Sequence, residues 1–243
     1  MGKVLIAMSG GVDSSVAAYL LKHSGWDCVG ATMTLYRNED IGISRSRTCC
    51  SLEDVEDARS VAFRLRIPYY VFNFSDEFRR QVMDRFADAY GQGRTPNPCI
   101  DCNRYLKFRH LYDRAALLGC DTIATGHYAR IERENGRYLL KKALDASKDQ
   151  SYVLYMLTQE QLAHTQFPLG ALHKSETRQL ADSLGFFNAR KPDSQDICFV
   201  PDGDYAAFIR RHTGKADTPG DFVDESGRTL GCHKGIAHYT IGQ

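Results

Sequence analysis

The sequence predicts an α/β protein with a doubly wound parallel sheet. Short apolar runs with strand character alternate with segments in which apolar residues recur at helical spacing. A glycine-rich stretch, AMSGGVDS, joins the first apolar run to the first helical segment. Alternating strands and helices build a parallel sheet covered by helices on both faces, and such sheets bind ligands beyond the carboxyl ends of their strands. We therefore expect the functional site at that edge of the sheet.

The first half of the chain contains the core of the predicted sheet. Gly25 is expected to end the first helix, and Ser51 with Asp54 three residues later forms a capping-box pattern at the start of the next one. Residues 91–99 are predicted to form an irregular loop, because two prolines and two glycines disfavour regular structure. The expected strands cover 4–6, 27–33, 69–74 and 121–125, and the expected helices cover 15–21, 52–65, 75–90 and 105–118.

The pattern changes after the last core strand. The expected elements there are a β-hairpin of 129–132 and 138–141 joined through Asn135 and Gly136, helices to about 184, a short helix from 204 to about 212, and a strand-turn-strand segment over 225–235. We therefore expect a catalytic domain over 1–203 and the start of a small β-rich domain over 204–243.

Composition and charge narrow the class of protein. Of 243 residues, 43% are hydrophobic and 25% are charged, which is typical of a soluble globular protein, and no apolar run approaches the roughly 20 residues of a membrane helix. The N-terminus passes directly from a short strand into the glycine-rich loop, so we expect no signal peptide, no membrane partner and a cytoplasmic location. A net charge of +1 does not indicate a nucleic-acid partner. Eight cysteines are unusual in the cytoplasm, so some are expected to be reactive or metal-bound.

The loop AMSGGVDS has the residues that an anion site requires. Gly10 and Gly11 let backbone N–H groups approach an anion, Ser9, Ser14 and Ser15 supply hydroxyls, and the following helix points its positive end at the loop. We therefore predict a phosphate or pyrophosphate site. The lysine of a GxxxxGK[ST] loop is absent, which disfavours transfer of a γ-phosphoryl group.

SGGVDS resembles the signature of the PP-loop (pyrophosphatase-loop) ATP enzymes. The resemblance implies cleavage of ATP between its α and β phosphates, adenylation of a carbonyl oxygen, and pyrophosphate bound in the loop. It also implies that Asp13 helps to hold Mg²⁺.

Two cysteines stand out. Cys102 lies at the start of a predicted helix near Arg104 and Lys107, so we expect a lowered pKa and a nucleophilic thiolate. Cys198 lies in an apolar segment flanked by acidic and turn-forming residues, and composition alone favours a buried, inert thiol there.

Six segments together resemble the tRNA-specific 2-thiouridylases over essentially the whole chain: AMSGGVDS, TPNPCIDCN, ATGHYAR, ALDASKDQSYVL, SQDICFVPDGDY and GIAHYTIGQ. The resemblance implies that the substrate is the wobble uridine of the tRNAs for Lys, Glu and Gln, whose C2 oxygen is replaced by sulfur at the expense of ATP and Mg²⁺. It implies nucleotide contacts at Ala7, Met8, Ser9, Gly10, Gly11, Val12, Asp13, Ser14, Met33 and Gly126, tRNA contacts at His127, Lys148, Asp149 and Gln150, and target-base contacts at Asn97, Pro98 and Cys99.

The resemblance also implies a catalytic pair, Cys102 and Cys198. A persulfide on Cys198 would deliver sulfur to the adenylated uridine, and Cys102 would resolve the transfer, leaving a disulfide that a thiol reductant must open. A sulfur-donor protein, such as a cysteine desulfurase or a relay protein, would load the persulfide. The segment 239–243 stops inside a longer family motif, so we expect this chain to be part of a protein that continues into a β-barrel.

One position departs from the family pattern. Many members have aspartate where this chain has Cys99, and Asp101 cannot simply inherit that role, since neighbouring loop positions point differently. An alternative is therefore that Cys99, Cys102 and Cys198 hold a [4Fe–4S] cluster with one open iron. A zinc site would need a fourth ligand from Cys49, Cys50 or a histidine.

The persulfide route is preferred, and no metal site is assigned. Two further alternatives are a PP-loop amidotransferase or ligase, which needs no reactive thiol pair, and a tRNA-binding module that only senses nucleotide.

Overall fold

The computed structural model describes residues 2–41, 52–193 and 196–241. Its main sheet has five parallel strands in the order β3-β2-β1-β4-β7. These strands are β1 (Lys3–Ala7), β2 (Asp27–Thr34), β3 (Tyr69–Asn73), β4 (Thr122–Ala124) and β7 (Thr165–Gln166). The chain leaves β1 toward β2 on one side and later returns to β4 on the other, so the strand order changes direction between β1 and β4. The predicted doubly wound parallel sheet is confirmed, and β7 is an additional strand that the sequence did not indicate.

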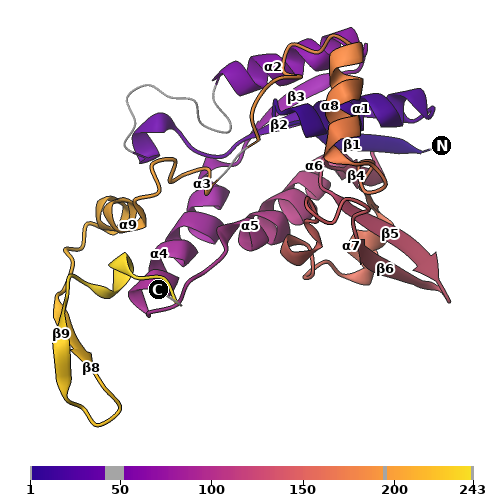
Figure 1. Cartoon of the computed structure of the whole chain (residues 1–243). Coiled ribbons are helices and arrows are strands. Elements are labelled where there is room, and N and C mark those ends of the chain that lie inside the picture. Colours follow the sequence, from indigo (N-terminus) through magenta and orange to yellow (C-terminus); the bar gives the residue numbers. More distant parts are fainter. Residues whose placement is uncertain (1, 42–51, 194–195, 242–243) are drawn as a thin grey trace.

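The central strand β1 is buried on both faces. Successive side chains of a strand point to opposite faces, so Leu5 packs into one apolar cluster while Val4 and Ile6 pack into the other. The first cluster is covered by helices between residues 75 and 117, and the second by α1 (Val12–His23), α2 (Leu52–Arg64) and α8 (Lys174–Ser183). Figure 1 shows α1, α2 and α8 gathered beside the sheet.

The helix predicted over 75–90 is confirmed, with a π-helical segment in its middle. It consists of α3 (Ser75–Phe78), η2 (Arg79–Met83) and α4 (Asp84–Gly91). Asp54 lies in α2, whereas the predicted cap residue Ser51 lies outside the described residues. Gly25 directly follows the C-cap of α1 with φ of +85°, as expected of a residue that ends a helix.

The predicted loop over 91–99 is too long by three residues, since α4 includes Gly91 and the next helix includes Pro98 and Cys99. A helical stretch begins at Pro98 and continues through α5 (Pro98–Asp101), the π-helical η3 (Cys102–His110) and α6 (Leu111–Leu117). The Asn97 side chain accepts a hydrogen bond from the Cys99 N–H at 3.0 Å, and proline suits the first helical position because it needs no N–H there. Cys102 therefore lies in the first turns of a helix that begins four residues before it, and the predicted start near 105 is wrong.

The later elements follow the predicted order. The hairpin of β5 (Ala129–Glu134) and β6 (Arg137–Lys142) turns through Asn135 and Gly136, both with positive φ, as predicted. The remaining elements are η4 (Ser151–Val153), α7 (Gln159–Ala163), α9 (Tyr205–Thr213), β8 (Gly220–Val223), β9 (Thr229–His233) and η5 (Ile236–His238).

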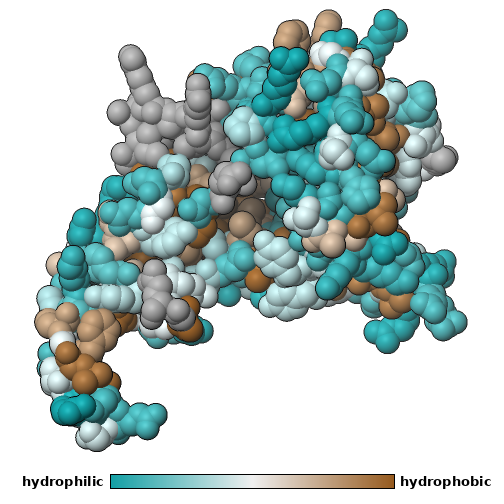
Figure 2. All heavy atoms as spheres, in the orientation of Figure 1, coloured by the Kyte–Doolittle hydropathy of each residue, from teal (hydrophilic) through white to brown (hydrophobic). Residues whose placement is uncertain are grey.

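The hairpin of β8 and β9 projects away from the rest of the chain (Figure 1). It carries exposed apolar side chains, including those of Phe222 and Leu230. Figure 2 shows brown surface over this hairpin. The division of the chain into domains after residue 203 stays a prediction. None of the helices in the described ranges has the length and apolar character that crossing a membrane requires.

Candidate functional site

The loop after β1 is held in one shape by its own side chains. Gly10 has φ of +75°, and a Cβ atom there would lie 2.4 Å from the carbonyl oxygen of Asp54, so only glycine fits without a backbone shift. The Ser14 hydroxyl accepts from the Ser9 N–H at 3.1 Å. Asn188 donates to the Gly10 carbonyl at 2.9 Å. The loop is therefore preformed rather than shaped by a ligand.

A second glycine opens space beside the N-terminus of α1. Gly126 follows β4, and a Cβ atom there would lie 2.8 Å from the Ser14 nitrogen and 2.9 Å from the Asp13 carbonyl carbon. No side chain caps α1, whose N-cap residue is Gly11. Backbone N–H groups and the positive end of the helix dipole favour a phosphate group at this position. The residues present therefore fit the pyrophosphate portion of a nucleotide.

The predicted nucleotide-contacting residues lie at one edge of the sheet. Residues 7–14 run from the end of β1 into α1, Met33 lies near the carboxyl end of β2, and Gly126 follows β4. Because these strands are parallel and adjacent, their carboxyl ends share an edge. Contact of these residues with ATP stays a prediction.

Asp13 has a partner that sequence analysis missed. Both of its carboxylate oxygens contact the Lys174 ammonium, at 2.7 and 2.8 Å, and one accepts from the Tyr128 hydroxyl at 3.0 Å. Burial raises the pKa of that tyrosine above its usual range, so the hydroxyl remains a donor. Lys174 is 161 residues away in the sequence and belongs to no recognisable motif with Asp13, so only the fold could reveal the contact.

The Cys102 thiol is not activated as predicted. Its pKa is raised to about 11, mainly by burial; nearby Lys107 opposes this increase, and Cys99 and Asp101 contribute smaller increases. The expectation of a lowered pKa is therefore wrong, because the side chain is only partly exposed and packs against the apolar core, and this burial outweighs the nearby cation Lys107. At neutral pH the sulfur is held as a thiol.

We expect alkylation of Cys102 by iodoacetamide to quicken with rising pH up to about pH 11, since only the thiolate reacts. Peptide mass spectrometry of the native protein gives the rate at this residue, and the urea-unfolded chain serves as the control, with a midpoint near the ordinary value of about 8.5. A native midpoint at or below the unfolded one would contradict the burial argument.

Cys198 lies at the same sheet edge as the nucleotide loop. The hydroxyl of Tyr36, which follows β2 by two residues, donates to the Cys198 carbonyl at 2.6 Å. Cys102 and Cys198 both pack against the same apolar cluster. The structure describes no disulfide between Cys102 and Cys198, and the predicted disulfide stays a prediction.

The metal alternatives gain no support from the geometry. Within residues 2–41, 52–193 and 196–241, no three His, Cys, Asp or Glu side chains converge as metal ligands. The alternative of a [4Fe–4S] cluster on Cys99, Cys102 and Cys198 therefore gains no support from the described residues and stays untested. Cys49 and Cys50, considered as zinc ligands, lie outside the described residues.

The predicted target-base residues lie together at the start of the 98–117 helical stretch. Asn97 caps it, Pro98 is buried, and Cys99 is exposed. Asp101 pairs with Arg85 at 3.1 Å. Base contact by residues 97–99 stays a prediction.

The predicted tRNA-contacting residues hold a surface segment in place. Gln150 exchanges hydrogen bonds with the backbone of Tyr128, at 2.9 and 3.0 Å. Burial would raise the pKa of Asp149, but hydrogen bonds from Ala143 and Ser151 keep it below its usual range. These contacts fix the loop between the β5–β6 hairpin and η4.

Lys148 and His127 differ in their access to a ligand. Lys148 is partly exposed and contacts Asp193 at 3.1 Å. The His127 ring is buried against Phe108 and Phe167 and contacts Thr125 at 2.7 Å. Burial, with Lys107 nearby, lowers its pKa well below its usual range, so the ring is neutral. This describes a satisfied core histidine, and its contact with tRNA stays a prediction.

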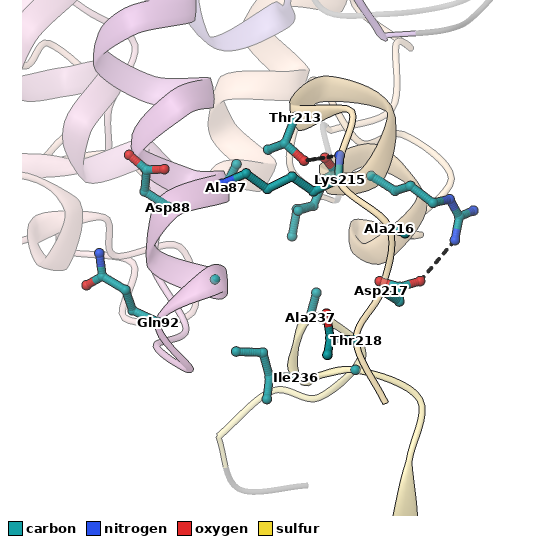
Figure 3. Close-up of a pocket in the computed structure, with 14 residues that line it drawn as sticks. Ala87, Asp88, Gln92, Thr213, Lys215, Ala216, Asp217, Thr218, Ile236 and Ala237 are labelled. Atoms are coloured by element: carbon teal, nitrogen blue, oxygen red, sulfur yellow. Dashed lines mark hydrogen bonds and ion pairs between the residues drawn. The ribbon is translucent and has the colours of Figure 1, made fainter. Parts of the chain in front are cut away.

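A cavity of about 370 Å³ lies elsewhere, between α4, α9 and η5. Figure 3 shows Asp88 and Gln92 on one side of it and Lys215, Asp217 and Ile236 on the other. Asp217 pairs with Arg210 at 3.1 Å across its rim. The cavity contains none of the predicted site residues.

Comparison with known proteins shows which protein family this chain resembles. The family model described as tRNA methyl transferase HUP domain matches residues 2–202, and the one described as tRNA methyl transferase PRC-barrel domain matches residues 206–243. The tRNA-specific 2-thiouridylase MnmA of Lachnoclostridium phytofermentans is 55% identical over 245 residues, covering 100% of this chain and 69% of that protein. MnmA of Clostridioides difficile is 54% identical over 243 residues, covering 99% of this chain and 67% of that protein.

A solved 4-thiouridine synthetase–RNA complex with bound ATP has a TM-score of 0.53 at 22% identity, covering 82% of this chain and 45% of that chain, and this likeness concerns the fold alone. The parallel sheet, its switch point and the glycine-lined loop define an α/β protein of the PP-loop class. The matches along the whole chain are more specific: the chain belongs to the family of tRNA-specific 2-thiouridylases.

Proposed function

We propose that this chain replaces the C2 oxygen of the wobble uridine of tRNA with sulfur and consumes ATP in doing so. The relatives named tRNA-specific 2-thiouridylases support this proposal. The observation that carries it is the hydrogen bond from the Tyr36 hydroxyl to the Cys198 carbonyl. Tyr36 follows β2 at its carboxyl end, the edge of the sheet at which the PP-loop also lies. Nucleotide and sulfur carrier would therefore act from one edge of the sheet.

The first step activates the uridine. Oxide is a poor leaving group at a pyrimidine C2, so the C2 oxygen attacks the α-phosphate of ATP and pyrophosphate departs. The N–H groups at the start of α1 would bind that pyrophosphate, and Asp13 would hold the Mg²⁺ that accompanies it. Met33 and Gly126 would contact the nucleotide from β2 and β4.

The second step delivers sulfur. The terminal sulfur of a Cys198 persulfide attacks C2, and AMP leaves with the former C2 oxygen. The Cys102 thiolate then attacks the Cys198 sulfur, so 2-thiouridine is released and a Cys102–Cys198 disulfide forms. Because burial holds Cys102 as a thiol, its thiolate must form when bound tRNA changes the surroundings of the helix start, where Cys99 is already exposed.

The tRNA would meet two surfaces. Asn97, Pro98 and Cys99 would face the flipped uridine, and residues 148–150, with His127 behind them, would contact the tRNA body. Tyr152 and Tyr155 are 61% and 66% exposed directly after this segment, which suits stacking on unpaired bases. The tRNAs for Lys, Glu and Gln are the proposed substrates. A cysteine desulfurase or a relay protein is the proposed sulfur donor, and the proposed location is the cytoplasm.

The test is analysis of tRNA nucleosides by mass spectrometry after incubation with Mg²⁺, ATP, a persulfide donor and a thiol reductant. We expect 2-thiouridine and pyrophosphate in equal amounts, with a tRNA carrying cytidine at the wobble position as the control. Pyrophosphate release with a uridine aminated at C2 instead would support the amidotransferase or ligase alternative, and no pyrophosphate with cognate tRNA would support a binding module.

A further inference from the structure

The solvent-facing side of α2 carries a regular stripe of four side chains. Residues three and four apart on a helix share one side of it, and this spacing relates Leu52, Glu56, Arg59 and Phe63. All four residues are exposed, whereas the opposite side of α2 is buried against the sheet. Figure 1 shows α2 along the upper margin of the molecule. The stripe is therefore accessible to another molecule.

The two ends of the stripe are large apolar side chains in contact with water. Leu52 is 84% exposed and Phe63 is 86% exposed, which makes them the two most exposed large hydrophobic residues of the part of the chain that the structure describes. A single exposed apolar residue is common on a protein surface and needs no explanation. Two of them on one side of one helix gain from being covered together, since burial removes both from water.

The middle of the stripe carries one charge of each sign. Glu56 and Arg59 form an ion pair at 2.8 Å, and their side chains are both more than half exposed. The other exposed charges of α2 follow the same order, with Glu53 in the first half of the helix and Arg64 in the second. The outer surface of α2 is therefore negative toward its N-terminus and positive toward its C-terminus. An exposed pair of this kind adds little to the stability of one chain, and both groups can take a second partner.

The stripe is complementary to itself when two copies of α2 pack antiparallel. The apolar pair and the charged pair have the same midpoint along the helix. A two-fold axis through that midpoint places Leu52 opposite Phe63 of the second copy, and Glu56 opposite Arg59 of the second copy. Apolar side chains then meet apolar ones, and the four charges alternate in sign. A two-fold interface requires this match of a surface with itself, whereas parallel packing would place each charge opposite its own sign.

We propose that the outer face of α2 binds a second copy of this chain, with the two helices antiparallel about a two-fold axis. An acidic or a basic partner would complement only one half of α2, whereas a second copy complements both. One pair of helices buries less than the roughly 1,200–2,000 Å² of a stable complex, so the dimer is weak, with a dissociation constant of about 10 µM to 1 mM. The inference is independent of the proposed function, because none of the four residues belongs to the candidate site.

The test is sedimentation equilibrium of the whole chain over about 10 µM to 1 mM, the range of the expected dissociation constant. The average mass should rise from that of one copy toward that of two. Glu56→Arg and Arg59→Glu should each weaken self-association at least about tenfold, because each variant places like charges opposite one another. An equal mixture of the two variants should associate again, since the positive stripe of one meets the negative stripe of the other.

A third variant tests the apolar ends of the stripe. Phe63→Ser should also weaken self-association at least about tenfold, and its melting temperature reports whether the fold is kept. The matched control is Leu230→Ser, which removes an exposed apolar side chain from the β8–β9 hairpin and should leave self-association unchanged. A constant mass up to about 1 mM, a mixture of the charge variants that stays monomeric, or association that depends on Leu230 and not on Phe63 would overturn the inference.

Discussion

Replacing Cys198 by serine is expected to lower 2-thiouridine formation at least about a thousandfold, the scale of loss when a covalent nucleophile is removed. Serine has the size of cysteine but cannot carry a sulfane sulfur. ATP affinity should stay within about twofold, because the hydrogen bond described at Cys198 uses its backbone carbonyl and joins it to Tyr36, two residues after β2, so the substitution keeps it. Nucleoside mass spectrometry and ATP titration measure the two quantities separately.

Cys102→Ser distinguishes the persulfide route from other routes. Without the resolving thiol, C2 should remain joined to Cys198 through two sulfurs, so a covalent tRNA–protein adduct should accumulate and a strong reductant should release it as 2-thiouridine. The matched control is Cys232→Ser, which removes an exposed thiol on β9. Full turnover by Cys102→Ser without an adduct would contradict the assigned roles.

Gly126→Ala is expected to weaken ATP and pyrophosphate binding by about a hundredfold or more, the effect of losing two hydrogen bonds to a charged group at roughly 1.5–3 kcal/mol each. The added Cβ would lie within 3 Å of backbone atoms of Asp13 and Ser14, which cannot move without shifting the start of α1. Calorimetric titration gives the affinities, and the melting temperature reports the fold.

The control for this substitution is Gly91→Ala at the end of α4, where a Cβ atom meets no atom within 4 Å. It should leave nucleotide affinity unchanged. An unchanged ATP affinity in Gly126→Ala would show that the space beside α1 is not the phosphate site.

The elements that sequence could predict are those whose signals are local. The strand β1 and the loop after it follow from three consecutive apolar residues and two glycines, and the β5–β6 hairpin follows from Asn135 and Gly136. The strand β7 has two residues, and only its pairing with β4 makes it a strand. The start at Pro98 is hard to predict, because prolines and glycines close together favour irregular structure, whereas asparagine followed by proline also starts helices.

The residues of the candidate site likewise divide into those that a local sequence pattern identifies and those that only the fold brings together. The loop residues could be identified from spacing, because an anion cradle is a local arrangement of glycine, serine and a helix N-terminus. The raised pKa of Cys102 could not be predicted from the sequence, since burial against distant core residues outweighs the cations next to it in sequence. The contact of Lys174 with Asp13 joins residues that only the packing of α8 on α1 brings together.

The central claim is that adenylation and sulfur transfer occur at one carbon, so the oxygen that leaves must be the one that was adenylated. The direct measurement uses an anticodon stem-loop with ¹⁸O at C2 of the wobble uridine, in the thiolation assay described above. We predict that each 2-thiouridine formed is matched by one AMP carrying ¹⁸O in its phosphate. Unlabelled AMP, with the ¹⁸O lost to water or retained in the uridine, would contradict the account.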